Sequence, residues 1–356
     1  MLSVCIIVKN EEKNIARCLQ CLKPHGFEVV VVDTGSTDKT KEVALQYTEH
    51  VYDFVWCDDF AVAKNFAISK ATNPYVMVID SDEFLEPLEV ERLYQMIKNH
   101  PRAVGRICRR NVFTRNGQEQ ENQEWINRVF PKDKYCYEGR IHEQIVVKDN
   151  DDNYETYQTP VVIEHTGYDL TLKERKEKAN RNYTLLIQEL ERLEKEESES
   201  KQIPYILYQL GKSCYMAEEY EKACEYFSQG LSYDLNPKLE YVIDMVETYG
   251  YALINSGQAQ TALLFENIYE EFGNNADFQF LMGLIYMNNA RFEQAVQEFL
   301  KATKHSQCRN KGVNSYSAYY NVGVIYECLG KKEEAITYYR KCGEYEPAKK
   351  RLADIK

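Results

Sequence analysis

A closely spaced pair of aspartates is the sharpest candidate for chemistry in this sequence. Asp80-Ser81-Asp82 comes directly after an apolar run, residues 75–79, that is typical of a buried strand. In open α/β sheets, ligands bind beyond the carboxyl ends of the strands. Two carboxylates on one tight turn can hold a divalent cation, which would neutralise charge developing on a departing diphosphate. The position at a strand end favours such a ligand site over the alternative, a solvated turn.

Three more polar groups follow or flank strands in the same region. Asp33 ends the apolar run 28–33, where its side chain has no helix N-terminus to cap. We therefore expect it to accept a hydrogen bond from a uracil imide or a ribose hydroxyl. Asp38 is expected to cap the next helix. Lys9 and Glu11 follow the first strand, where the backbone can line a nucleoside pocket. For the glutamate, a place in a helix first turn is an equal alternative. Lys64, near the start of another helix, is the cation expected against base or phosphate.

Alternating strands and helices must position these groups. We expect apolar strands at 3–9, 28–33, 51–55 and 75–80, and helices over 11–22, 38–47 and 61–70. Continuous apolar strands separated by amphipathic helices predict a parallel sheet that is covered on both faces. Further strands are expected near 104–108, 143–148 and 161–165. Arg106, Arg109 and Arg110 flank the first of these three and are expected on a solvated edge.

The second half of the sequence repeats. Residues 171–200 predict a charged connecting helix with one apolar stripe. Beyond it, four glycines are each followed twelve residues later by an alanine: Gly211 and Ala223, Gly250 and Ala262, Gly283 and Ala295, Gly323 and Ala335. An aromatic residue four positions further completes three of the four: Phe227, Phe299 and Tyr339. The second repeat has Glu266 there, and the segment 304–314 reads as an inserted loop. This register resembles tetratricopeptide repeats, in which small residues let paired helices pack closely.

Charge and cysteine content limit the partners and the compartment. A formal net charge of −12 argues against nucleic acid as a partner and requires a local cation wherever a nucleotide binds. The 11 cysteines are an odd, scattered set, which predicts reduced thiols. The N-terminus begins with a strand-like run rather than a signal peptide, and no apolar run reaches the ~18 residues that a membrane span needs. We therefore expect a cytoplasmic protein without a transmembrane segment.

Four segments of the first half resemble the family-2 inverting glycosyltransferases of the GT-A fold: residues 3–22, 31–38, 63–67 and 75–82. The resemblance implies an α/β GT-A domain with a Rossmann-like mixed sheet over residues 1–170. A helical linker over 171–203 and an all-α tetratricopeptide-repeat domain over 204–356 would follow.

By the same resemblance, the donor is a UDP-sugar held with Mn²⁺ or Mg²⁺. Asp33, Lys64 and Asp80 would contact the uridine part, and Asp82 the metal. Lys64 stands where the family commonly has arginine. The same donor site is expected to include Val8, Lys9, Glu11 and Ser81.

The stretches 125–130, 139–143 and 163–168 resemble a bacterial subgroup of that family. This subgroup includes lipopolysaccharide-core glucosyltransferases and repeat-fused enzymes that glycosylate peptides or flagellin. The resemblance implies transfer to a peptide or protein hydroxyl or thiol, with the repeats binding the acceptor, forming a homodimer, or both. The alternatives are a lipid-linked or cell-surface glycan as acceptor, and a non-catalytic repeat scaffold.

An acceptor hydroxyl or thiol must lose its proton as it attacks the sugar, so a carboxylate base is needed. Glu143 is the first choice and Glu124 the second, with His142 orienting the carboxylate. His165 follows in chain order and is expected as a further metal ligand. The alternative for both histidines is a satisfied place in the core.

Overall fold

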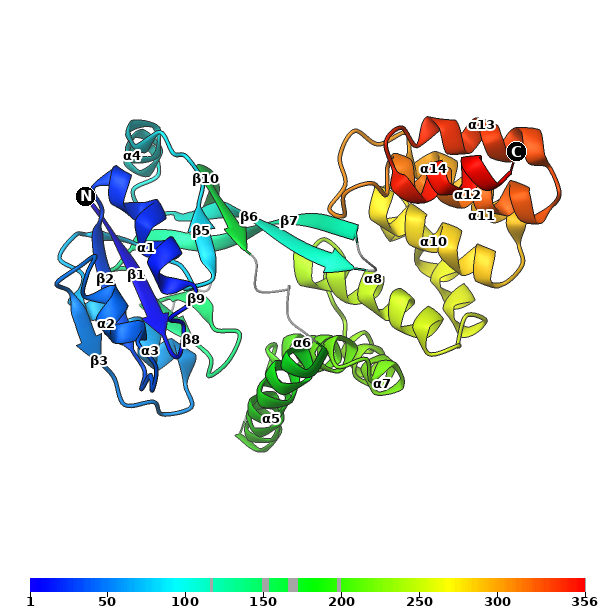
Figure 1. Cartoon of the computed structure of the whole chain (residues 1–356). Coiled ribbons are helices and arrows are strands. Elements are labelled where there is room, and N and C mark those ends of the chain that lie inside the picture. Colours follow the sequence, from blue (N-terminus) through cyan, green and yellow to red (C-terminus); the bar gives the residue numbers. More distant parts are fainter. Residues whose placement is uncertain (116–117, 149–153, 166–171, 197–199, 356) are drawn as a thin grey trace. The chain divides into compact units, whose positions relative to one another are not determined.

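The computed structural model describes residues 1–115, 118–148, 154–165, 172–196 and 200–355. The chain divides into two compact units, Met1–Thr171 and Leu172–Lys356, and Figure 1 labels their elements. The first unit combines strands and helices, and the described part of the second is helical. The expected fold class, an α/β domain followed by an all-α repeat domain, is thereby confirmed.

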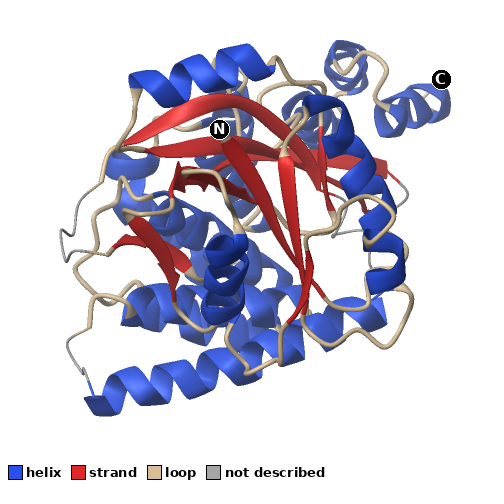
Figure 2. Ribbon diagram, turned by 90° about the vertical axis from the view of Figure 1, so that its left-hand side faces the viewer, coloured by secondary structure: helices blue, strands red, loops and turns tan. Residues whose placement is uncertain are grey.

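The first unit is built on a mixed eight-stranded sheet in the order β3-β2-β1-β4-β7-β6-β10-β5, whose strands are red in Figure 2. Its strands are β1 (Leu2–Val8), β2 (Glu28–Asp33), β3 (Val51–Asp53), β4 (Tyr75–Val78), β5 (Glu83–Leu85), β6 (Val104–Arg115), β7 (Gln118–Pro131) and β10 (Thr156–His165). The strands β3, β2, β1 and β4 are parallel neighbours, as the alternating pattern predicts. β7 then runs antiparallel between β4 and β6, and β5 antiparallel to β10.

Alternate strand residues bury two separate layers of apolar side chains. The helices of this unit are α1 (Ile15–Leu22), η1 (Lys23–His25), α2 (Thr40–Ala44), α3 (Phe60–Lys70) and α4 (Val90–Asn99), and a hairpin consists of β8 (Tyr135–Glu138) and β9 (Gln144–Val147). Val4 and Ile6 of β1 pack in one layer with α1 and α4. Cys5, between them, packs in the other layer with α3 and the hairpin. Because β1 is covered on both faces, its carboxyl end is the part left open to a ligand.

The second unit is a succession of antiparallel helices (Figure 1). These are α5 (Leu172–Glu196), α6 (Ile203–Met216), α7 (Tyr220–Gly230), α8 (Glu240–Asn255), η2 (Thr261–Ile268), α9 (Tyr269–Phe272), α10 (Ala276–Asn288), α11 (Phe292–Ala302), α12 (Tyr316–Cys328), α13 (Lys332–Lys341) and α14 (Glu346–Asp354). The segment expected as a linker consists largely of α5, which belongs to this unit and packs on α6. Among the described helices, none combines the length and the apolar character needed to cross a bilayer.

The repeat glycines lie directly beneath aromatic rings. A Cβ added at Gly211 would come within 2.5 Å of Phe227, and one at Gly283 within 2.6 Å of Phe299. Gly323 stands in the same relation to Tyr339, at 2.5 Å. Since Cβ atoms do not approach other carbons so closely, glycine is required where each ring crosses the first helix of its repeat.

The second repeat departs from this pattern at the position that lacks an aromatic residue. Its second helix is not an α-helix but the 3-10 segment η2, continued by the short α9. Glu266 points outward and pairs with Arg291 at 2.9 Å, so no ring covers Gly250, whose neighbour is Leu281 of the next repeat. The ring that η2 places against α8 is instead Phe265, which is buried and whose centre lies 5.8 Å from that of Tyr249.

The inserted loop 304–314 places a guanidinium among buried carboxylates. Arg309 pairs with Asp244 at 2.7 Å and with Glu247, both on α8. The backbone N–H groups of Arg309 and Asn310 each donate to the Asp277 carboxylate at 2.8 Å. The loop is therefore anchored to α8 and α10 by charge, in addition to the burial of Val313 in the apolar core of this unit.

Candidate active site

The ends of β1 and β2 are tied into one rim by their following loops. The Val8 carbonyl accepts from the Thr34 N–H at 2.9 Å and from its hydroxyl at 3.0 Å. Asn10, whose φ of 56° lies in the left-handed region, accepts from the Thr37 N–H at 2.8 Å. Lys9 beside it is exposed. These contacts bring the two loops expected to hold a nucleoside to the same edge of the sheet.

Glu11 precedes α1 and forms hydrogen bonds with the residues at the start of that helix. Its backbone carbonyl accepts from the Ile15 N–H at 2.9 Å, and its side chain accepts from the Asn14 amide at 2.9 Å. Because α1 begins at Ile15 and has no acidic residue in its first turn, the expected first-turn role of Glu11 was wrong.

Asp33 does make a local turn, so the expectation that it has no capping geometry was wrong. Its Oδ1 accepts from the N–H groups of Gly35 at 2.8 Å and Ser36 at 2.7 Å. Such side-chain to backbone bonds are typical of aspartates that begin a turn. Its Oδ2, however, is buried and has no hydrogen-bond partner among the described residues. One lone acceptor at the carboxyl end of β2 thus remains for a ligand donor.

Asp80 is held by two buried cations on opposite oxygens. Its Oδ1 lies 3.3 Å from the Lys64 Nζ, and its Oδ2 accepts from Arg128 at 3.0 Å. Burial opposes ionisation, but Lys64, Arg128 and then Arg109 outweigh it and hold the Asp80 pKa far below its usual range. The side chain is still 37% exposed, so one face of this ionised carboxylate is open to a ligand.

Glu83 holds the backbone of the Asp80-Ser81-Asp82 turn through its buried carboxylate. It is fully buried, accepts from the Asp80 N–H at 2.9 Å, and contacts Arg128 and Arg109 at 3.3 Å each. A buried carboxylate between two guanidiniums is costly to disturb, because removal of either partner leaves an unpaired charge. The Asp80-Ser81-Asp82 turn, with Ser81 buried in its middle, is accordingly rigid.

Lys64 reaches two carboxylates at once. Its Nζ lies 2.5 Å from the Glu143 Oε1 in addition to the Asp80 contact. Burial lowers the pKa of Lys64, yet Asp80 and Glu143 raise it above its usual value. Glu143, the first-choice base, is thus ion-paired to Lys64, which was expected to contact the nucleoside. His142, expected to orient Glu143, has a left-handed φ of 53° and accepts from Gln144 through its carbonyl at 2.9 Å.

Glu124, the second-choice base, belongs to a different pair. Its Oε1 accepts from Arg109 at 2.7 Å and from the Asn111 amide at 2.7 Å. Arg109, expected on a solvated edge, instead bridges Glu124 and the buried Glu83. Both candidate bases therefore start from ion pairs, and Glu143 has the more buried side chain, 11% exposed against 38%.

The two expected metal ligands face each other. The Asp82 Oδ2 lies 3.3 Å from the His165 Nε2, and the opposite ring nitrogen, Nδ1, lies 2.8 Å from the Asn111 Oδ1. The Asn111 amide nitrogen is directed to Asn122 and Glu124 at 2.7 Å each, so its oxygen faces the imidazole and the hydrogen sits on Nδ1. The Nε2 atom is then the ring nitrogen that faces the Asp82 carboxylate.

Two electron-donating atoms directed at each other attract only with a proton or a cation between them. This donor set, one imidazole nitrogen and one carboxylate oxygen, fits a divalent ion that takes its remaining ligands from water and a diphosphate. Within the residues described, no group of three His, Cys, Asp or Glu side chains is placed to hold a metal without such outside ligands.

Sequence reasoning missed three side chains that hold this site together: Arg128, Glu83 and Asn111. All three are less than a tenth exposed and lie in strands or directly after the aspartate turn. A signal was present for Arg128, because a charge directly before the apolar pair Val129-Phe130 indicates a cation buried with a partner.

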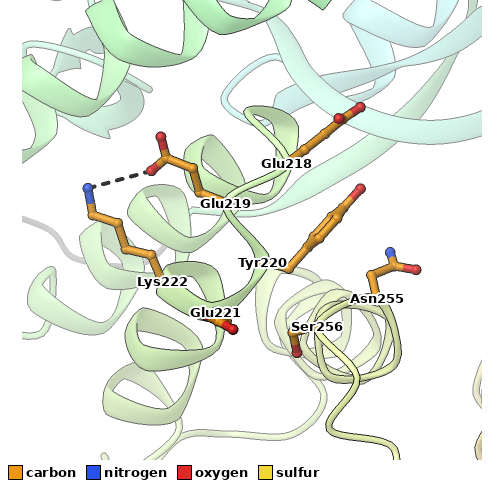
Figure 3. A pocket seen from close by; sticks show the side chains of 7 residues that line it. All are labelled: Glu218, Glu219, Tyr220, Glu221, Lys222, Asn255 and Ser256. Atoms are coloured by element: carbon orange, nitrogen blue, oxygen red, sulfur yellow. Dashed lines mark ion pairs between the residues drawn. The ribbon is translucent and has the colours of Figure 1, made fainter.

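A separate hollow of about 510 Å³ lies in the repeat unit, between the start of α7 and the end of α8. Figure 3 shows its lining, in which Glu219 pairs with Lys222 beside Tyr220 and Asn255. The hollow is open and contains none of the site residues expected from the sequence, so we attach no chemistry to it.

Comparison with protein families gives one match in each unit. Residues 3–165 match the model of Glycosyl transferase family 2. Residues 276–304 and 316–349 match that of the Tetratricopeptide repeat, which agrees with the third and fourth repeats described above. The first match contains every site residue discussed here.

Among similar proteins is the lipopolysaccharide core biosynthesis glycosyltransferase LpsC of Rhizobium meliloti (strain 1021). It is 30% identical over 166 residues, which cover 44% of this chain and 60% of LpsC. The SPbeta prophage-derived glycosyltransferase SunS of Bacillus subtilis (strain 168) is 25% identical over 236 residues, 64% of this chain and 52% of SunS. A TPR repeat-containing protein of Synechococcus elongatus is 40% identical over 83 residues, 23% of this chain and 21% of that protein. The chain thus spans less than two thirds of each of these relatives.

Proposed function

The N-terminal domain of this chain, residues 3–165, belongs to glycosyl transferase family 2, and on this basis we propose that the chain transfers a sugar from a UDP-sugar with inversion. The acceptor is a hydroxyl or thiol of a peptide or protein. We assign the transfer to residues 1–170 and acceptor binding to the repeats over 204–356, with 171–203 connecting them. A cytoplasmic location is part of this proposal, and it is supported by eleven free cysteines.

The observation that carries the proposal is the opposed pair Asp82 and His165 beside the ionised Asp80. When bound there, a divalent metal supplies Lewis-acid stabilisation of the leaving diphosphate. An imidazole ligand suits Mn²⁺ better than Mg²⁺, which prefers oxygen ligands throughout. Asp33 supports the donor assignment, since its buried Oδ2 can accept from the uracil imide or a ribose hydroxyl.

In this proposal, the residues of the chain have separate roles in a single displacement reaction. Val8, Lys9 and Glu11 line one side of the nucleoside, while Asp80 and Ser81 line the other. Glu143 takes the proton of the acceptor as its oxygen or sulfur attacks the anomeric carbon. The bond from that carbon to the diphosphate breaks, and the diphosphate leaves with the electron pair.

A glycan acceptor is the second candidate, and one comparison favours it. LpsC is named for lipopolysaccharide core biosynthesis and shares 30% identity with this chain. In that case the repeats dock the enzyme to an assembly complex or to a second copy of itself. A non-catalytic scaffold is the third candidate, and the ordered charges around Asp80 argue against it.

Hydrolysis of UDP-sugars without acceptor tests the core of the proposal. The purified full chain is incubated with MnCl₂ and each of several UDP-sugars, and released UDP is measured. We expect release that depends on Mn²⁺ and falls at least 100-fold in Asp82→Asn, while Asp53→Asn, an exposed surface aspartate, retains it. Unchanged release in Asp82→Asn would refute the metal assignment. Mass gain on candidate peptides or glycans then separates the two acceptor classes.

A further inference from the structure

The Lys64 ammonium contacts one residue assigned to the donor and one assigned to the acceptor. Lys64 is only 4% exposed, and its Nζ contacts Asp80, which borders the donor, and Glu143, which is assigned to the acceptor. The Glu143 contact is the shorter, 2.5 Å against 3.3 Å. Before the donor binds, the base is therefore paired with a group that belongs to the donor side.

This pairing occupies Glu143, because its Oε1 lies 2.5 Å from the Lys64 Nζ. A general base must be within hydrogen-bond reach of the proton that it takes, and an oxygen that holds an ammonium is not available to an acceptor hydroxyl. The other charged groups facing Glu143 are Arg128 of β7 and Asp80, and the phenol of Tyr137 belongs to the same cluster. Asp80 and Arg128 already neutralise each other at 3.0 Å, so Lys64 is the cation that governs Glu143.

One buried hydroxyl of this cluster has its hydrogen-bonding capacity unused among the described residues. The Tyr137 ring lies beneath the Lys64 ammonium, 5.4 Å from its centre, and the Tyr137 hydroxyl is buried without a hydrogen-bond partner among the described residues. The Asp33 Oδ2 is in the same condition. Buried polar atoms without a partner are rare, and these two atoms are placed to form hydrogen bonds with a bound ligand.

We propose that Lys64 couples donor binding to acceptor deprotonation: the anionic donor draws the ammonium away from Glu143, and the freed carboxylate becomes the base. The inference rests on the proposed function, in which Glu143 and Asp80 serve acceptor and donor. Its consequence is an enzyme in which the base is competent only after the donor has bound. Lys64 is thus a positioning residue that acts through Glu143.

Proton linkage of UDP binding tests this without knowledge of the acceptor or the sugar. Isothermal titration of UDP with MnCl₂ into the full chain, in buffers of different ionisation enthalpy between pH 5 and 8, gives the protons taken up per UDP. We expect the wild type to take up a fraction of a proton more per UDP than Glu143→Gln at pH 5, and no more at pH 8, because an unpaired glutamate is partly protonated only near its ordinary pKa of about 4.3. Glu124→Gln is the matched control, since Glu124 pairs with Arg109 and should keep the wild-type uptake.

Each outcome bears either on the coupling or on the proposed function. Equal uptake in the wild type and Glu143→Gln overturns the coupling and leaves the proposed function intact. Loss of the excess uptake in Glu124→Gln instead of Glu143→Gln also overturns it and identifies the other carboxylate as the coupled group. Failure of UDP with MnCl₂ to bind the wild type overturns the proposed donor, and the coupling with it.

Discussion

The Nδ1 atom of His165 lies 2.8 Å from the Oδ1 atom of Asn111, on the adjacent parallel strand. This bond sets which ring nitrogen faces Asp82. We expect Asn111→Leu, which keeps the branched shape and removes the acceptor, to weaken Mn²⁺ binding about 10- to 100-fold in the presence of UDP. Manganese titration followed by electron paramagnetic resonance measures the free ion directly. Unchanged affinity would show that the ring orientation does not depend on this bond.

The anchor of the inserted loop predicts a large difference between two arginines of the repeat unit. Arg309→Ala leaves the buried Glu247 without its cation, while Asp244 keeps Lys212 at 2.6 Å. We expect a loss of about 2 kcal/mol or more in the stability of α8. Arg291→Ala removes a surface pair whose two side chains are each 41% exposed, so the loss should be ~0–1 kcal/mol. Hydrogen exchange of α8 and α10 amides in the full chain measures both. Equal effects would contradict the structural role of the loop.

Glu247 makes the repeat unit sensitive to pH. Burial raises its pKa to about 8 against the attraction of Arg309, with Asp277 and Asp244 raising it further. A carboxyl whose pKa is raised on folding stabilises the folded state at low pH, and that contribution is lost as the pH rises from about 4.5 to about 8. We expect α8 to lose stability over this range by about 4 kcal/mol more in the wild type than in Glu247→Gln, since one pKa unit corresponds to about 1.4 kcal/mol. Hydrogen exchange at pH 5 and 8, corrected for the intrinsic rate, provides the comparison; parallel pH profiles would contradict the shift.

The contact between Gly283 and Phe299 predicts an overpacked repeat on addition of one methyl group. Gly283→Ala would place its Cβ 2.6 Å from the ring, and we expect a loss of about 1–3 kcal/mol. A second change, Phe299→Leu, removes the ring and should make the alanine nearly harmless in that background. Thermal unfolding of the four proteins gives the coupling energy. Additive losses would mean that the glycine is needed for another reason.

Residues whose pattern is local could be predicted from the sequence, and residues whose partners are distant in the chain could not. β2 was placed at its observed limits because it is a run of four valines bounded by Glu28 and Asp33. β7 was missed because its first seven residues, 118–124, are all Gln, Glu or Asn, and its pairing with β6 supplies what apolar alternation does not. Arg109 was misplaced for the same reason: its partners Glu83 and Glu124 lie on β5 and β7, and nothing local to β6 shows them.

The order of the sheet has a consequence for synthesis of the chain. β5 carries Glu83 yet pairs only with β10 among the described strands, and β10 ends at His165. On the ribosome, the aspartate turn therefore emerges about eighty residues before the strand that completes it, and until then β5 has no neighbour with which to pair. The strands β1, β2 and β4, which position Asp33 and Asp80, can pair before then. The contact between Asp82 and His165 can form only when the last strand enters the sheet.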